Sequence, residues 1–292
     1  MKKGDNKDKN IEDIILVPTD FSETCGNAIS HSVRLAQVFG MKVCILHVIN
    51  KETKAILKKK DDNVNYIYKR LKEYKSYYEK KYRVSVETLA VEGSIFSVIN
   101  QVAKDIKARL MILGTHGKKG LQHVFGSYAL RVVLDCPVPV IVVQKRTAKK
   151  GYHNIVFPIS NELEPRQKVQ WAGQIARTFD SKIHLFRALE SDAGLNSRLT
   201  IITHQITTVL DEKKIPYEVI VAEKTGDLAN QVIRYSVRQA CDLIMIMTRP
   251  NADVSGFSFS AWDEKLMFNE SQIPVMCINP VNLADYYYDW MM

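Results

Sequence analysis

Leu110-Met-Ile-Leu-Gly-Thr-His-Gly-Lys-Lys-Gly-Leu-Gln-His-Val-Phe-Gly-Ser127 is an apolar run that ends in a glycine-rich, basic loop and then becomes a helical pattern. Glycine lets the backbone approach a ligand and adopt positive φ at little cost. Loop N–H groups and a helix N-terminus both favour an anion, and Lys118 and Lys119 add positive charge. The stretch predicts a strand, a phosphate-binding loop and a helix beginning at Gly126-Ser127. The alternative is a surface turn that needed its glycines.

The same alternation of strand and helix runs through the first half of the chain. Apolar runs predict strands at 14–18, 43–49, 84–91, 110–114 and 138–143. Helical patterns occupy 24–39, a long segment ending near Arg83, 95–107 and 127–135. This alternation predicts an α/β fold with a mostly parallel sheet covered by helices on both faces. Ligands of such sheets bind beyond the carboxyl ends of the strands, where the strand order reverses. We therefore expect Asp20, after the first strand, and Gly114, after the fourth, at one edge.

The second half repeats the first. Gly93 and Arg109 correspond to Gly226 and Asp242, each 133 residues further on. Ile15-Leu-Val-Pro-Thr-Asp20 matches Ile155-Val-Phe-Pro-Ile-Ser160 at an offset of 140, and Val138-Pro-Val-Ile matches Ile273-Pro-Val-Met at 135. A repeat of this length indicates a duplicated domain, and 292 residues suit two domains of about 150. We expect domains at 11–147 and 152–281, a disordered tail at 1–10 and an aromatic tail at 282–292.

Composition indicates a globular protein with an uneven charge. Hydrophobic residues make up 46% and charged residues 25% of the chain, and the net charge is +9. Residues 1–150 hold 28 Lys and Arg against 15 Asp and Glu, whereas 151–292 hold 13 against 17. The first half is therefore the one suited to an anionic ligand. Residues 51–83 carry 12 basic and 5 acidic residues. A solvated helix, with Tyr66, Leu71, Tyr74 and Tyr78 towards the core, is favoured there over a nucleic-acid surface.

Several classes of protein lack support. No apolar run approaches the ~20 residues of a membrane helix, and the N-terminus has no apolar signal-peptide core. Five scattered cysteines without a CxxC pair predict reduced, buried thiols in a cytoplasmic protein, with no zinc site or disulfide framework. The first strand ends in Pro18-Thr-Asp20 instead of the G-x-G-x-x-G of dehydrogenases, and no P-loop motif occurs. No catalytic residue is assigned.

Asp20 has two readings. Its carboxylate could accept hydrogen bonds from a base amine or a ribose hydroxyl, at a distance from any phosphate. It could equally cap the helix predicted from residue 24, a role that Ser22 could also fill. The spacing does not separate these two.

Val17-Pro-Thr-Asp-Phe-Ser22, His47-Val48, Gly114-Thr-His-Gly117, Gly126-Ser127 and Val138-Pro-Val-Ile-Val-Val143 resemble the universal stress protein family. The duplicated layout resembles its tandem members. The resemblance implies two Rossmann-like domains of the adenine nucleotide alpha hydrolase type, each with a five-stranded sheet. The family's nucleotide-binding pattern places nine residues between its second and third glycines. This chain has eight between Gly117 and Gly126.

The resemblance also implies a ligand and its contacts. Pro18, Thr19 and Asp20 would contact the adenine, and Val48 would pack near the base. Gly114 and Gly117 would line the ribose and phosphates, whereas Gly126, Ser127 and His116 would reach the phosphates. The implied cofactor is ATP or another adenine nucleotide, alone or with Mg²⁺. The implied role is stress response or signalling, with at most slow ATP hydrolysis or self-phosphorylation. A tandem scaffold that binds no nucleotide and acts through protein contacts is the alternative.

The second copy departs from this pattern. Ser160 stands in the place of Asp20, and Met247 and Pro250 replace Gly114 and Gly117. A methionine fills space that a close backbone approach needs, and proline lacks an N–H donor. We expect this copy to bind no nucleotide in the same manner and to pack against the first. The family implies that the strands near 138–143 and 274–278 pair across that contact. A homodimer or a separate protein partner stays open.

Overall fold

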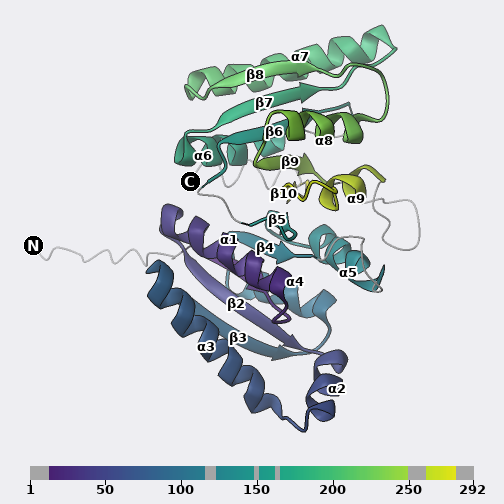
Figure 1. Ribbon diagram of the computed structural model, residues 1–292. Coiled ribbons are helices and arrows are strands. Elements are labelled where there is room, and N and C mark those ends of the chain that lie inside the picture. Colours follow the sequence, from purple (N-terminus) through teal and green to yellow (C-terminus); the bar gives the residue numbers. More distant parts are fainter. Residues whose placement is uncertain (1–12, 116–122, 148–150, 162–164, 249–260, 281–292) are drawn as a thin grey trace, which may run out of the picture.

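The computed structural model describes residues 13–115, 123–147, 151–161, 165–248 and 261–280, and only the backbone within 123–128. Its strands form one sheet in the order β3-β2-β1-β4-β5-β10-β9-β6-β7-β8 (Figure 1). The strand bounds are β1 Ile14–Pro18, β2 Lys42–Ile49, β3 Val86–Glu92, β4 Leu110–Gly114, β5 Val140–Val143, β6 Asn154–Ile159, β7 Lys182–Arg187, β8 Tyr217–Val221, β9 Leu243–Met247 and β10 Val275–Ile278.

Helices cover both faces of this sheet. One face packs against α1 Glu23–Phe39, α3 Val64–Tyr82, α6 Val169–Phe179 and α7 Ala193–Glu212. The other packs against α4 Ile95–Asp105, α5 His123–Leu134, α8 Leu228–Arg238 and α9 Ala261–Met267. Helix α2, Lys51–Lys59, follows β2, and a short 3₁₀ helix, Pro165–Lys168, precedes α6. Alternation along each strand sends side chains to both cores, because Ile15 and Val17 join one and Leu16 the other.

The predicted fold class is confirmed. Read from its outer edge, each half has the same order, β3-β2-β1-β4-β5 in the first and β8-β7-β6-β9-β10 in the second. All pairs are parallel except β5 with β10. The five cysteines are buried and unpaired, as predicted. None of the described helices is long and apolar enough to cross a membrane.

Two helix predictions differ from the structure. The long helix ending near Arg83 is two helices, because α2 ends at Lys59 and Asn63 caps α3 through its side chain. In α3, Leu71 and Tyr78 are buried against the core, as the amphipathic pattern predicts. Helix α5 begins at His123, four residues before the predicted start at 127. The predicted tails at 1–10 and 282–292 lie outside the described residues.

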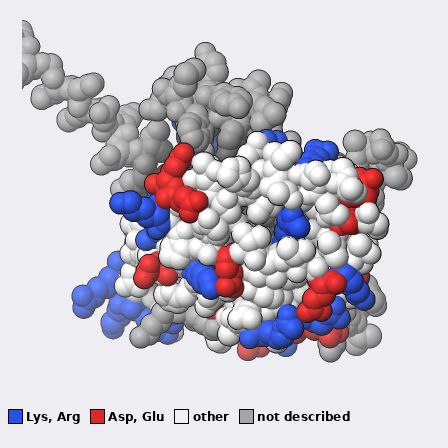
Figure 2. Space-filling view, turned by 90° about the horizontal axis from the view of Figure 1, so that it is seen from above, with Lys and Arg blue, Asp and Glu red and all other residues white. Residues whose placement is uncertain are grey.

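The two halves join along β5 and β10. These strands pair antiparallel, with Met276 opposite Ile141 at the centre of the contact (Figure 1). The pairing that the family implied is therefore confirmed within this single chain. Figure 2 views the far end of the second half, where α7 and β8 lie. The described Lys and Arg side chains on that face are interspersed with Asp and Glu, so the positive charge of the protein is not concentrated there.

Candidate functional site

The strand order reverses between β1 and β4, and the candidate site lies at this point. The two strands pair at only two positions, Ile15 with Leu110 and Leu16 with Met111. The chain leaves β1 towards β2 on one side and leaves β4 towards β5 on the other. Such a reversal opens a crevice beyond the carboxyl ends of the strands. Asp20 and Gly114 are 94 residues apart in sequence, and the topology brings both to this edge.

The turn after β1 is held by its own side chains. The Thr19 N–H donates to Leu46 O over 2.8 Å, and Thr19 Oγ1 accepts from the Phe21 N–H at 3.0 Å. Phe21 has a φ of 65°, in the left-handed region. The Asp20 side chain is exposed, and its Oδ1 accepts from the Ser22 N–H at 2.8 Å. Thr19 thus holds the turn, and the exposed Asp20 lies beyond the carboxyl end of β1.

Ser22, and not Asp20, caps α1. The Ser22 Oγ accepts from the Cys25 N–H at 3.3 Å, which is the N-cap hydrogen bond of this helix. Ser22 therefore fills the N-cap position, while the Asp20 side chain closes the preceding turn and also interacts with Cys25 in the first turn of α1. This leaves the ligand reading of Asp20 compatible with the local structure.

His47 and Val48 lie near the end of β2, beside this turn. Val48 is buried on the side of the sheet that α4 and α5 cover. On the opposite side, His47 Nδ1 lies 2.8 Å from Thr19 O and its ring stacks on Phe21 with centroids 4.6 Å apart. Burial lowers the pKa of His47, so the imidazole is neutral near pH 7. Of these two residues, only Val48 faces the core that α4 and α5 cover.

The sequence did not predict that aromatic rings surround Arg70 beside Phe21. The Arg70 guanidinium lies over the Phe21 ring, 5.2 Å from its centroid, and donates to the hydroxyls of Tyr66 and Tyr74 at 3.3 Å. These residues are far from Phe21 in sequence, so only the packing of α3 on α1 and β1 could reveal the cluster. The basic, aromatic composition of 51–83 was the available signal, and it indicated a helix face only.

The sequence suggested that the backbone at Gly114 comes close to a ligand. In the structure it comes close to the backbone of α1. A Cβ at Gly114 would lie 3.0 Å from Thr24 O and 3.2 Å from Cys25 Cα, both backbone atoms of α1. The glycine therefore lets the start of α1 pack directly on the end of β4. This contact holds the turn that precedes α1 close to the end of β4.

Gly114→Ala is expected to lower the free energy of unfolding by about 1.5 kcal/mol, because backbone must shift to admit the methyl group. Gly26→Ala is the matched control. A Cβ at Gly26 meets nothing within 4 Å, and alanine in a helix interior should stabilise by up to about 1 kcal/mol. Urea unfolding of both variants measures the two changes. Equal effects of the same sign would contradict the packing role of Gly114.

Thr115 follows Gly114 and carries a buried hydroxyl. Its N–H donates to Val143 O at 2.9 Å, while its Oγ1 has no hydrogen-bond partner among the described residues. The counterpart in the second half is Thr248, whose hydroxyl donates to Asn279 Oδ1 and to Ile278 O. A buried hydroxyl without a partner is costly, so Thr115 offers a site for a ligand oxygen or for water.

The remaining loop residues can be placed only in part. His116 and Gly117, with Lys118 and Lys119, lie outside the described residues. Gly126 and Ser127 are the fourth and fifth residues of α5, not its start. The helix N–H groups that lack a helical partner belong to the first turn, so these groups precede Ser127. The prediction that Gly126-Ser127 opens the helix is wrong, because α5 begins at His123, three residues before Gly126.

The second half has a different arrangement at the same point. Ser160 follows β6, and Met247 ends β9 with its side chain buried. At the corresponding position of the first half, Gly114 carries no side chain and packs against the backbone of α1. Pro250 lies outside the described residues.

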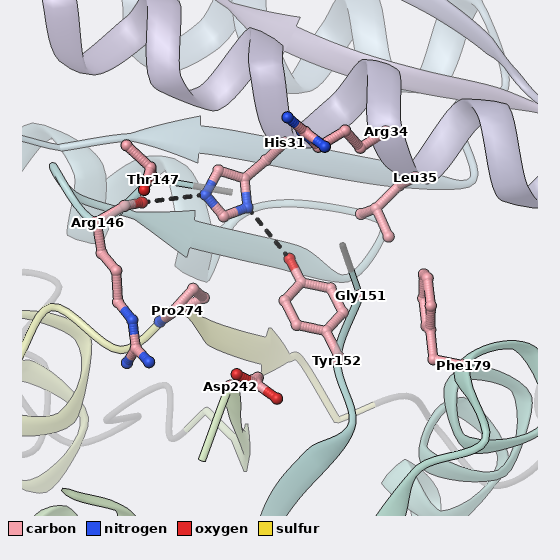
Figure 3. Close-up of a pocket in the computed structure, with 10 residues that line it drawn as sticks. All are labelled: His31, Arg34, Leu35, Arg146, Thr147, Gly151, Tyr152, Phe179, Asp242 and Pro274. Carbon is pink, nitrogen blue, oxygen red and sulfur yellow. Dashed lines mark hydrogen bonds between the residues drawn. The ribbon is translucent and has the colours of Figure 1, made fainter. Parts of the chain in front are cut away.

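A cavity between the two halves is too small for a nucleotide. It has a volume of about 30 Å³, and Figure 3 shows His31 of α1 reaching across it towards Tyr152 of the second half. Small-molecule sites typically have about 300–1,000 Å³, whereas this space suits one or two waters. Its residues are His31, Arg34, Leu35, Arg146, Thr147, Gly151, Tyr152, Phe179, Asp242 and Pro274.

Comparisons with known proteins match the first half and the overall fold. The model of the universal stress protein family matches residues 13–144. A universal stress protein of Methanocaldococcus jannaschii is 30% identical over 145 residues, which are 47% of this chain and 85% of that protein. A second from the same organism is 27% identical over 158 residues, 46% of this chain and 96% of that protein.

Solved structures share the fold of this chain over almost its whole length. The crystal structure of a universal stress protein from Archaeoglobus fulgidus matches with a TM-score of 0.74 and 14% identity, over 91% of this chain and 98% of that one. A functionally unknown protein from Pseudomonas aeruginosa matches with a TM-score of 0.64 and 15% identity, over 95% and 96%. At these identities the structures establish the fold alone, whereas the sequence relatives establish the family. This chain belongs to the universal stress protein family.

Proposed function

We propose that the first half binds an adenine nucleotide, ATP in the first place, at the carboxyl ends of β1 and β4. We further propose that the protein is a tandem member of its family, with domains at 11–147 and 152–281, acting in stress response or signalling. The observation that carries this proposal is the meeting of Asp20, Gly114 and the unpartnered Thr115 hydroxyl at the point of strand reversal.

Each part of the nucleotide has a matching group in this arrangement. The exposed Asp20 carboxylate is an acceptor for the adenine amine or a ribose hydroxyl, and Pro18 and Thr19 would border the adenine. Val48 supplies an apolar wall for the base. Thr115 Oγ1 is an additional candidate contact for the ribose. The phosphates would meet Gly114, His116, Gly117, Gly126 and Ser127, beside the first turn of α5, whose free N–H groups favour an anion.

Titration calorimetry of the full chain with ATP, ADP and AMP, at millimolar nucleotide with Mg²⁺, tests this proposal. Asp20→Asn is expected to weaken binding about tenfold, because it removes one charge-assisted hydrogen bond. The asparagine Oδ1 can still accept from the Ser22 N–H, so the turn is preserved. Asp62→Asn, an exposed aspartate beyond α2, is the control and should bind as the wild type does.

Two results would count against the proposal. No heat and no rise in melting temperature with any of the nucleotides would leave the scaffold alternative, in which the tandem protein acts through protein contacts. Normal affinity of Asp20→Asn with normal folding would show that Asp20 does not contact the base or ribose.

A further inference from the structure

Phe21 has an uncommon backbone conformation directly after Asp20. Its φ of 65° lies in the left-handed region, which a residue with a bulky side chain rarely adopts. Such a conformation persists only where the surrounding contacts determine it. The contacts of the Phe21 ring therefore decide the path of the turn that carries Asp20.

Three side chains from β2 and α3 contact this ring. His47 stacks on it, with ring centroids 4.6 Å apart and planes 19° apart. Tyr74 meets it edge-on at 5.6 Å, and the Arg70 guanidinium lies 5.2 Å from its centroid. We call Phe21 and these three residues the Phe21 clamp. Ring stacking and cation–π contacts depend on orientation, so the clamp favours one placement of the ring and of the turn.

Hydrogen bonds connect the clamp to its surroundings. His47 Nδ1 lies 2.8 Å from Thr19 O, and its Nε2 lies 3.3 Å from the Thr53 hydroxyl of α2. A neutral ring with the proton on Nδ1 donates to Thr19 O and accepts from Thr53. Arg70 donates to the Tyr74 hydroxyl at 3.3 Å. The clamp therefore holds the backbone of the turn as well as the Phe21 ring.

The placement of Arg70 is not explained by an ion pair. Its interactions are with rings and phenol hydroxyls, and none within the described part of the chain is with a carboxylate. The contact with the Phe21 ring is the one that joins this arginine to the turn between β1 and α1.

The second half does not repeat the clamp. The register of β1 with β2 and of β6 with β7 aligns the two halves, and it places Asn161 at the position of Phe21 and Arg187 at that of His47. One helix, α7, follows β7 where α2 and α3 follow β2. The fold can thus be built without the clamp, which occurs in the half that carries Asp20.

We propose that His47, Arg70 and Tyr74 are positioning residues, which act through Phe21 to hold the Asp20 carboxylate in place for the nucleotide. This inference rests on the proposed function of the first half. The clamp residues contact the turn and one another, so their effect on affinity passes through Asp20. The basic, aromatic segment 51–83 thereby has a role in the site as well as in the core.

A double-mutant cycle on the full chain tests this inference by titration calorimetry with ATP and Mg²⁺. Arg70→Met is expected to weaken binding about threefold and Phe21→Leu about fivefold. In the Asp20→Asn background each should weaken binding by less than about twofold, because the group that the clamp positions is already altered. Lys72→Met removes one positive charge from an exposed position of the same helix and should bind as the wild type does.

Amide hydrogen exchange measured by NMR without nucleotide tests the clamp separately from the proposed function. The Ser22 N–H donates to Asp20 Oδ1, so a loosened turn should expose this N–H to water. Its exchange should be about fivefold faster in Phe21→Leu and Arg70→Met than in the wild type, and unchanged in Lys72→Met. Arg70 is partly exposed, so Arg70→Met should fold normally even if Phe21→Leu does not.

Two outcomes overturn the inference. The first is equal weakening of ATP binding by Arg70→Met in the wild-type and Asp20→Asn backgrounds, which would show that Arg70 does not act through Asp20. The second is an unchanged exchange rate of the Ser22 N–H in both clamp variants. Absence of nucleotide binding by the wild type would instead contradict the proposed function, and faster Ser22 exchange in the variants would then still show that the clamp holds the turn.

Discussion

Asn279→Ala is expected to lower the free energy of unfolding by about 2–3 kcal/mol, because it removes a partner from main-chain carbonyls at the joint between the halves, of which Val133 O also accepts from the Cys136 N–H at 3.2 Å. Asn279 follows β10, and its Nδ2 lies 2.7–3.0 Å from Val133 O, Leu134 O and Cys136 O, which share its two N–H groups. These carbonyls lie at the C-terminal end of α5 and just beyond it, in the other half. Helix ends need such outside partners because their last carbonyls have none within the helix.

Gln144 makes the reciprocal contact and provides an internal comparison. It follows β5, and its amide donates to Met267 O at 3.5 Å and Asn269 O at 3.1 Å, near the end of α9. Because these bonds are fewer and longer, Gln144→Ala should cost less than Asn279→Ala. Asn65→Ala, at an exposed position of α3, should change stability by less than about 0.5 kcal/mol.

Urea unfolding followed by circular dichroism measures all three variants. Only three residue pairs join β5 to β10, so the side-chain caps are a large part of the contact. An Asn279→Ala variant as stable as Asn65→Ala would show that water replaces the amide without cost. The caps would then have no role in holding the halves together.

Local patterns account for how well the strands were predicted. The predicted strands at 14–18 and 110–114 have the bounds of β1 and β4. Each is a short apolar run closed by a residue that cannot continue it, Pro18 in one case and Gly114 in the other. The break between α2 and α3 was missed because the polar residues around Asp61 and Asn63 lie within a uniformly charged segment. The N-cap of α3 at Asn63 therefore cannot be distinguished in the charge pattern, although it is clear in the structure.

Contacts between distant residues account for what the sequence could not predict. Asn279 and Val133 are 146 residues apart, and no local signal at either position indicates a helix cap. Lys168 follows Glu162-Leu-Glu-Pro-Arg-Gln, a polar run typical of a surface, yet it is buried between β6 and β9. The candidate nucleotide site includes features that a local sequence signal predicts and features that depend on contacts between distant residues. Its motif residues could be found in the sequence, whereas the packing of Gly114 on α1 and the unpartnered Thr115 hydroxyl required the fold.

Acid is expected to weaken the joint through His31. The buried His31 ring bridges the halves, with Nε2 3.2 Å from Arg146 O and Nδ1 3.5 Å from the Tyr152 hydroxyl (Figure 3). A neutral ring with the proton on Nε2 satisfies both contacts, because it donates to the carbonyl and accepts from the hydroxyl. A protonated ring could no longer accept from Tyr152, and Arg34 and Arg146 nearby also disfavour its charge.

The pKa of His31 falls from an ordinary value of 6.5 to about 4, chiefly because of burial. As pH falls below 6.5, the unfolded chain takes up a proton at this position and the folded chain does not. The contribution of His31 is therefore fully present above pH 6.5 and is lost progressively towards pH 4. Between pH 7 and pH 5 the loss amounts to about 2 kcal/mol.

Comparing His31→Gln with the wild type isolates this effect from other titrating groups. Glutamine can still donate to Arg146 O but does not titrate, so the variant should lose about 2 kcal/mol less than the wild type between pH 7 and pH 5. Other buried histidines, such as His47, remain in both proteins and cancel in the difference. His204→Gln, at an exposed position of α7, should keep the wild-type pH dependence. Urea unfolding at pH 7, 6 and 5 measures the free energy of unfolding of both variants. If it falls equally in His31→Gln and His204→Gln, protonation of His31 does not cause the loss of stability in acid.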